Sequence, residues 1–200
     1  MKKFLKKIGA GLSSTILDGA GFTMIELLIV IAVLGVLATA VLSAINPIEQ
    51  INRGRDTGSR SDSEQLLSAF DRYYTTQELY PWQDTADDAA DLDLRIVNSA
   101  WEETGGNEGV LEKLSAGGTA EIKESFVNRL DKLDDRYKLH VHYTDSPGNS
   151  AYVCFEARSG SFKTEALTRC ETNCAGLPSD LDVSACDLIC DADFPKICLP

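Results

Sequence analysis

The stretch that decides the fold is residues 22–45, FTMIELLIVIAVLGVLATAVLSAI. Glu26 is its only charged residue. As an α-helix this stretch extends about 36 Å at about 1.5 Å per residue, which is enough to cross the roughly 30 Å hydrocarbon core of a bilayer. Apolar residues occupy every side of the helix, and such a helix belongs in lipid or inside a protein core. The sequence therefore predicts a transmembrane helix over residues 22–45.

Charge is distributed unevenly on the two sides of this helix. Residues 1–21 carry four lysines and one aspartate, a formal charge of +3, whereas the whole chain of 200 residues carries −12, so the remainder carries −15. A basic start followed by an acidic remainder predicts a cytoplasmic N-terminus and a domain beyond the cytoplasmic membrane. The acidic balance also argues against direct nucleic-acid binding, which needs a basic surface.

The helical period continues after the apolar stretch. Pro47 predicts a kink or a break, but apolar residues recur at helical spacing through Ile51, Leu66 and Phe70, with polar residues between them. We therefore predict one long helix over about residues 23–77, with residues 46–80 forming its amphipathic continuation.

Residues 81–200 are expected to form an extracytoplasmic globular α+β domain. A weak apolar stripe over residues 92–101 predicts a helix, residues 110–114 predict one or two helical turns, and residues 120–135 predict a helix capped by Thr119.

From Tyr137 the apolar period changes to two. This predicts strands over residues 137–143 and 151–157, with a third beginning at 162–164. Two turn clusters, at 145–149 and 159–160, separate these strands. The expected fold class is α+β, in which the long N-terminal helix packs on a small antiparallel sheet and disulfides staple the C-terminal tail.

Six cysteines lie between Cys154 and Cys198, in the segment predicted to be extracytoplasmic. An even count in an oxidising compartment indicates disulfides, and six cysteines allow 15 connectivities. Two pairs are each spaced by four residues, so helical turns would place each pair on one face. Two antiparallel turns would then align the pairs Cys170–Cys190 and Cys174–Cys186. Cys154, on the second strand, is left to pair with Cys198 near the terminus, so the proposed third pair is Cys154–Cys198.

Metal binding is the alternative for several of these residues. Cys170, Cys174, Cys186 and Cys190 could form a four-thiolate zinc site, although such sites are more natural in a reducing compartment. His140 and His142 share one strand face and could be two ligands, but the simpler interpretation is the solvent side of a half-buried strand. The tail carboxylates could bind calcium, without an EF-hand pattern; they are Asp180, Asp182, Asp187, Asp191 and Asp193. No metal site or cofactor is predicted.

The segment Gly21-Phe22-Thr23-Met24-Ile25-Glu26, with the apolar run after it, resembles the processing signal of type IV prepilins. The resemblance covers Lys2 to about Trp82. It implies that residues 1–21 are a leader, that a prepilin peptidase cuts after Gly21, and that the new N-terminal Phe22 is methylated. It further implies that Glu26, the fifth mature residue, pairs with a neighbouring subunit's amine during assembly.

The function that the resemblance implies is structural: a pilin or pseudopilin of a type IV pilus, or of a filament like those of type II secretion or competence. Its expected partners are the peptidase, the cytoplasmic membrane, copies of itself and other pilins. Before assembly it would be a single-pass membrane protein, and afterwards part of an extracytoplasmic filament at the cell surface.

Two other interpretations remain open. Ala38-Thr39-Ala40 fits a signal-peptidase site, so the chain could be a membrane-anchored binding protein with an ordinary signal anchor. A secreted enzyme is the third hypothesis, but the sequence contains none of the GxSxG, HExxH, P-loop or dinucleotide patterns. The chain is therefore not expected to be an enzyme.

Overall fold

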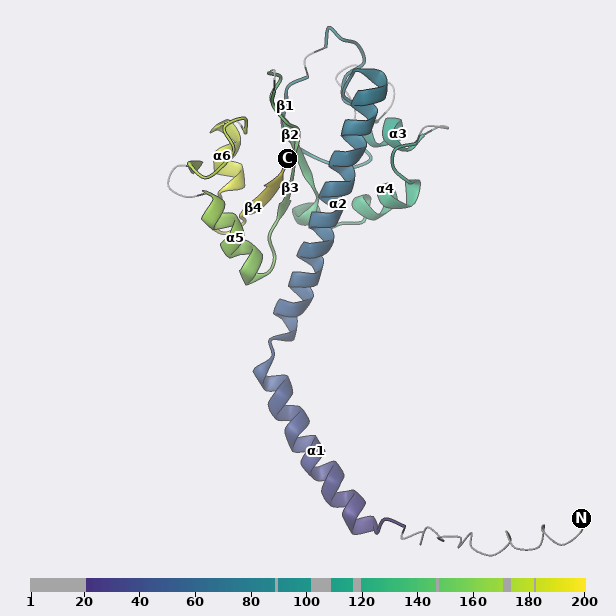
Figure 1. The fold of residues 1–200 in the computed structure, drawn as a ribbon, viewed down its shortest axis with the longest axis vertical. Helices are drawn as coiled ribbons and strands as arrows, with labels where there is room; N and C mark the ends of the chain where they lie inside the picture. Colours follow the sequence, from purple (N-terminus) through teal and green to yellow (C-terminus); the bar gives the residue numbers. More distant parts are fainter. Residues whose placement is uncertain are drawn as a thin grey trace, which may run out of the picture. The chain divides into compact units, whose positions relative to one another are not determined.

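A computed structural model describes residues 21–88, 90–101, 109–116, 120–146, 148–170, 174–181 and 183–200 (Figure 1). The chain divides into two compact units, one ending at Asn46 and one spanning Pro47–Pro200. Each unit is described separately. The predicted N-cap Thr119 lies outside the described residues.

The first unit is the helix α1, Met24–Ala44, which is followed by Ile45 in an extended conformation. The second unit begins with α2, Pro47–Gln77. Asn46 precedes a proline, which disfavours helical backbone at that residue, and Pro47 fits the first position of a new helix because no N–H is needed there. The break expected at Pro47 is confirmed, and α2 lies within the helical continuation expected over residues 46–80. The expectation of a single helix over residues 23–77 is wrong, because Ile45 and Asn46 interrupt it.

The second unit is built on a four-stranded antiparallel sheet with the order β1-β2-β3-β4. Its strands are β1 Leu92–Ile96, β2 His140–Tyr143, β3 Tyr152–Glu156 and β4 Lys196–Leu199. The C-terminal tail thus supplies an edge strand, and Cys154 of β3 lies directly opposite Cys198 of β4. The antiparallel sheet of the predicted α+β fold is confirmed.

Helices cover both faces of the sheet (Figure 1). On one side lies α2, with α3 Val110–Ser115 and α4 Glu124–Asp131 beside it. On the other side lie α5 Gly160–Cys170 and α6 Val183–Ile189. A short helix, η1 Asp135–Tyr137, precedes β2.

Two apolar clusters correspond to these layers. The larger contains the fully buried Leu66 and Phe70 of α2, packed with Val141 and Phe155 of the sheet. The smaller is formed by Tyr152, Cys154, Leu181, Ala185, Ile189 and Cys198. Because both faces of the sheet are covered, every residue of β3 is buried, as expected for a central strand between two layers.

Three local predictions were wrong or only partly right. Residues 92–96 of the helix expected over 92–101 form β1, whose backbone pairs with β2. The third strand expected at residues 162–164 lies inside α5. The helix expected over 120–135 is shorter, since α4 ends at Asp131 and η1 follows.

Candidate functional site

The first turn of α1 contains a reciprocal capping arrangement. Thr23 is the N-cap, and its hydroxyl oxygen accepts a hydrogen bond from the Glu26 N–H at 3.3 Å. Glu26 Oε2 in turn accepts from the Thr23 N–H at 2.8 Å and from the Thr23 hydroxyl at 2.7 Å. This capping box satisfies two N–H groups that have no partner within the helix.

The residues on either side of the expected cleavage point are accessible. Phe22 has 88% of its surface exposed, and a Cβ atom added at Gly21 would meet nothing within 4 Å. Sequence reasoning proposed Gly21, Phe22 and Glu26 as site residues and did not include Thr23. The Thr-x-x-Glu spacing at the start of an apolar run is the signal that could have identified Thr23 as the cap.

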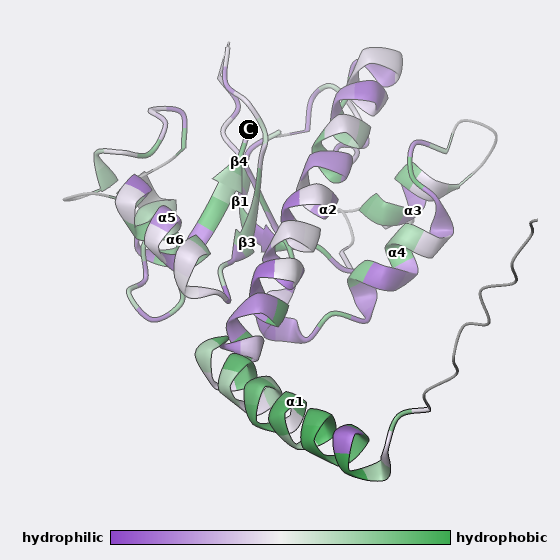
Figure 2. Cartoon of the chain, turned by 60° about the horizontal axis from the view of Figure 1, so that its bottom comes forward, coloured by the Kyte–Doolittle hydropathy of each residue, from purple (hydrophilic) through white to green (hydrophobic). Residues whose placement is uncertain are grey.

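The remainder of α1 is apolar and unburied. None of its 21 residues is buried, and Figure 2 shows hydrophobic colour along most of the helix, with a hydrophilic band near its start. In the described part of the chain, it is the one helix long and apolar enough to cross a membrane. At about 1.5 Å per residue it extends about 32 Å, close to the thickness of a bilayer core.

A comparison with protein families identifies the sequence motif that contains this first turn. The model for the prokaryotic N-terminal methylation motif matches residues 19–42. The chain carries a type IV prepilin leader. No curated protein and no solved structure matches the chain.

The prepilin motif has direct consequences for the chain. It is the class III leader signature, and it supports a precursor of the type IV pilin or pseudopilin kind. It implies processing by a prepilin peptidase and assembly with other pilins, and it points to a structural protein rather than an enzyme. Together with the apolar α1, it supports anchoring in a membrane.

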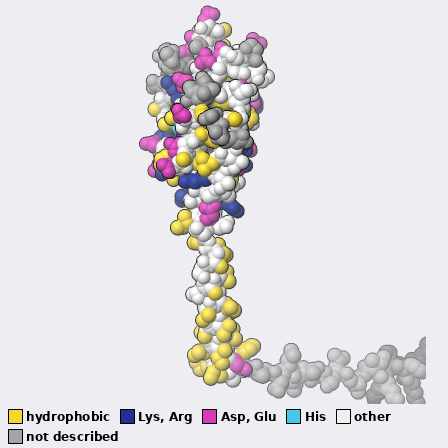
Figure 3. Space-filling model, turned by 90° about the vertical axis from the view of Figure 1, so that its left-hand side faces the viewer, with side chains coloured by type: hydrophobic (Ala, Val, Ile, Leu, Met, Phe, Trp, Pro, Cys, Tyr) yellow, Lys and Arg dark blue, Asp and Glu magenta, His cyan; other side chains and the backbone are white. Residues whose placement is uncertain are grey.

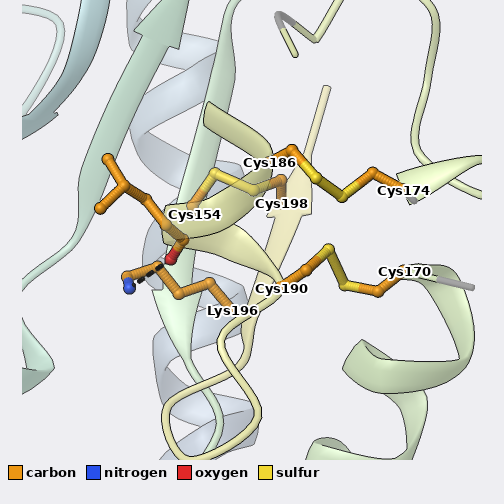
Figure 4. Close-up of a disulfide and its surroundings, with 8 residues drawn as sticks. Cys154, Cys170, Cys174, Cys186, Cys190, Lys196 and Cys198 are labelled. Carbon is orange, nitrogen blue, oxygen red and sulfur yellow. Dashed lines mark hydrogen bonds between the residues drawn. A yellow bond between two sulfur atoms is a disulfide. The ribbon is translucent and has the colours of Figure 1, made fainter. Parts of the chain in front are cut away.

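The cysteines of the prepilin tail are all in disulfides (Figure 4). Cys154–Cys198 joins facing residues of β3 and β4, with Cα atoms 4.0 Å apart. The other two disulfides lie beside each other and fasten the segment around α6 to the end of α5. They are Cys170–Cys190 and Cys174–Cys186, with Cα separations of 5.6 and 6.1 Å.

The zinc site considered as an alternative involves these same cysteines. The Sγ atoms of Cys174, Cys186 and Cys190 lie within 4.8 Å of one another. Each of them belongs to a disulfide, whereas a zinc site requires thiolates. In the disulfide form the cluster therefore offers no zinc ligands.

The two histidines are not on a solvent face, which corrects the simpler interpretation of their strand. His142 is 2% exposed, and its Nε2 lies 3.3 Å from the Thr144 hydroxyl. His140 is half-buried, and its burial, together with the nearby Lys196 cation, lowers its pKa to about 4. The layer formed by α5, α6 and the tail covers this side of the sheet, and nothing local in the sequence indicated that layer.

Two of the tail carboxylates considered for calcium make internal hydrogen bonds. Asp180 accepts from the Tyr152 hydroxyl at 2.6 Å and from the Ser150 N–H at 3.1 Å. Asp191 accepts from the N–H groups of Asp193 and Phe194 at 2.8 and 2.9 Å. Asp182 lies outside the described residues. These contacts give the two carboxylates a role in holding the tail.

Proposed function

We propose that the chain is a structural subunit of a type IV pilus or related pseudopilus, cut after Gly21 and assembled through α1. The observation that carries this proposal is the combination of the methylation motif with a helix that buries none of its apolar residues. Such a helix needs lipid around it before assembly and other helices around it afterwards. In lipid, helices associate through packing and polar contacts rather than through the hydrophobic effect.

The geometry of Glu26 is consistent with a role in assembly. Both Thr23 donors bond to Oε2, and among the described residues no hydrogen bond reaches Oε1. A carboxylate has about four acceptor sites. Glu26 can therefore keep its capping bonds while Oε1 accepts the positively charged N-terminal amine of a neighbouring subunit, which is protonated at neutral pH. That contact would fix the stagger between subunits.

The first test is the mature N-terminus. Mass spectrometry of the membrane-bound and filament-associated chain is expected to find N-methylated Phe22. An intact Met1 or an N-terminus at Val41 would instead support the membrane-anchored binding protein.

The second test is the variant Glu26→Ala, with Glu64→Ala as a matched control because Glu64 is an exposed acid on α2. Glu26→Ala is expected to be inserted normally and to appear in filaments at least tenfold less, whereas Glu64→Ala assembles like the wild type. Normal incorporation of Glu26→Ala into filaments would contradict the assigned role.

A further inference from the structure

Basic residues gather at the end of the globular unit where α2 begins, and Figure 3 shows lysine and arginine side chains there. Arg53 and Arg55 are exposed near the start of α2. Arg158 and Lys163 flank the start of α5, and both are partly exposed. These four residues are named the basic end.

Hydrogen bonds hold the two segments of the basic end together. The buried Asp56 carboxylate accepts from the N–H groups of Arg158 and Ser159 at 3.0 and 2.8 Å. Arg53 Nε donates to the Ser161 hydroxyl at 3.0 Å. The start of α5 is thereby fixed against the first turns of α2, so the four cations belong to one rigid surface.

Two of these cations form no close ion pair in the described part of the chain. Among the described residues, neither Arg55 nor Arg158 forms an ion pair, and Arg158 Nε has no hydrogen-bond partner. The Arg158 guanidinium lies over the Tyr137 ring, 3.8 Å from its centroid. Burial lowers the pKa of Arg158 and so does the neighbouring Arg55, while Tyr137 and the carboxylates of Asp56 and Glu156 act in the opposite direction. Arg55 and Arg158 therefore repel each other, and an added anion would stabilise both charges.

The covalent chain keeps this surface close to the end of the apolar helix. Arg55 lies 11 residues after Ala44. The three steps from Ala44 to Pro47 span at most about 11 Å, and the helical rise from Pro47 to Arg55 adds about 12 Å. The Cα atoms of Arg53 and Arg55 therefore stay within about 23 Å, along the chain, of the residue where α1 ends. The helix α1 is just long enough to fill a bilayer core.

We propose that the basic end binds the phosphate groups of anionic phospholipids at the extracytoplasmic surface while the subunit is anchored by α1. Guanidinium groups suit this ligand because they present paired N–H donors to phosphate oxygens. The remainder of the chain after residue 21 carries −15 with these cations included, so the basic end is a local exception on a domain whose net charge an anionic membrane repels. The inference rests on the membrane-anchored state in the proposed function, but not on filament assembly.

The test uses the processed full chain in nanodiscs of phosphatidylcholine with increasing phosphatidylglycerol, and native mass spectrometry to count the phosphatidylglycerol molecules that it retains. Each basic residue near an anionic surface is worth roughly fivefold in affinity, so Arg55→Gln combined with Arg158→Gln is expected to weaken retention about 30-fold. Arg95→Gln, an exposed arginine on β1, is the matched control and should retain lipid like the wild type.

Two further variants guard against a folding defect, since Arg158 packs on Tyr137. Arg55→Gln alone changes an exposed side chain and is expected to weaken retention about fivefold, and Arg55→Lys should restore it. Unchanged retention in the double variant, or equal loss in Arg95→Gln, would overturn the inference.

The source of the phosphate is tested by adding inorganic phosphate to the chain in a zwitterionic detergent. Saturable binding of free phosphate at the basic end, with no preference for phosphatidylglycerol, would overturn the assignment to lipid. Loss of filaments with unchanged lipid retention would assign the basic end to a contact with another subunit. A chain that retains lipid but never assembles would leave this inference intact and contradict only the proposed function.

Discussion

The helices α1 and α2 follow each other in the chain, yet they are stabilised in opposite ways. The 21 residues of α1 include none that is buried, whereas α2 buries seven of its 31, among them Leu66 and Phe70. Most helices in water depend on tertiary packing of one face. One face of α2 packs against other parts of the same chain, whereas no face of α1 does. The difference indicates that the packing partners of α1 are lipid or other chains.

The largest expected effect comes from separating the two helices. A chain beginning at Pro47 should fold with its three disulfides, and its free energy of unfolding should match that of the processed chain within about 0.5 kcal/mol. It should lose membrane association altogether, because α1 is the membrane-spanning candidate. Urea unfolding followed by circular dichroism and membrane fractionation measures both properties. An unfolded product would show that α1 contributes to the core of the globular unit.

The disulfides should show how strongly the tail is bound to the globular unit. Replacing both Cys154 and Cys198 with alanine opens a link across 44 residues, and replacing Cys174 and Cys186 opens one across 12. Loop entropy predicts losses of about 4 and about 3 kcal/mol respectively. Urea unfolding of the two variants measures which loss of stability is larger. A larger loss for the Cys174–Cys186 pair would mean that the edge strand β4 is held by its backbone bonds rather than by sulfur.

Two carboxylates of α2 test how strongly this helix is held to the rest of the globular unit, since they bind backbone groups about 100 residues away. Asp56 is fully buried and holds the N–H groups of Arg158 and Ser159, so Asp56→Ala should destabilise the globular unit by about 3 kcal/mol. Glu49 is partly exposed and holds the Gly160 N–H at 3.0 Å, so Glu49→Ala should cost about 1 kcal/mol. Equal losses in thermal unfolding would contradict the distinction by burial.

The globular unit should also show a pH dependence of stability. The pKa of His140 is about 4 in the folded chain and 6.5 as its ordinary value. Below pH 6.5 the unfolded chain therefore binds a proton that the folded chain does not, so this residue destabilises the fold as pH falls from 6.5 to 4. The effect is about 2 kcal/mol for a group that is not fully buried. The His140→Gln variant should lose less stability than the wild type over this interval in urea titrations. If stability depends on pH equally in the variant and the wild type, His140 does not cause the pH dependence.

Strong local signals in the sequence predicted parts of both units. The helix over residues 22–45 agrees with α1 to within two residues at each end, because its apolar run needs no long-range information. The strands around Val141 and Val153 were found because their alternation is clear. In the structure, Cys170–Cys190 and Cys174–Cys186 have the pairing proposed from the four-residue spacing, and Cys154–Cys198 is the pair that remained.

The failures occur where a distant segment decides the local structure. Leu92 and Ile96 are four residues apart and fit a helical stripe, but pairing with β2 makes this segment a strand. The start of α5 was expected to be a strand because its caps come from the side chains of Asp56 and Glu49, more than 100 residues earlier. The sequence pattern around residues 160–164 carries no information about carboxylates so far away in the chain.

The sequence alone determined that this chain has an apolar helix with one acid near its start, a prepilin leader before it, and an acidic cysteine-rich domain after it. Those features depend on the order of residue types along a few turns of chain. Tertiary structure alone decided that the C-terminal tail becomes a strand and that both faces of the sheet are covered. It also decided which cations gather at the basic end, because segments far apart in sequence must fold together before their charges become neighbours.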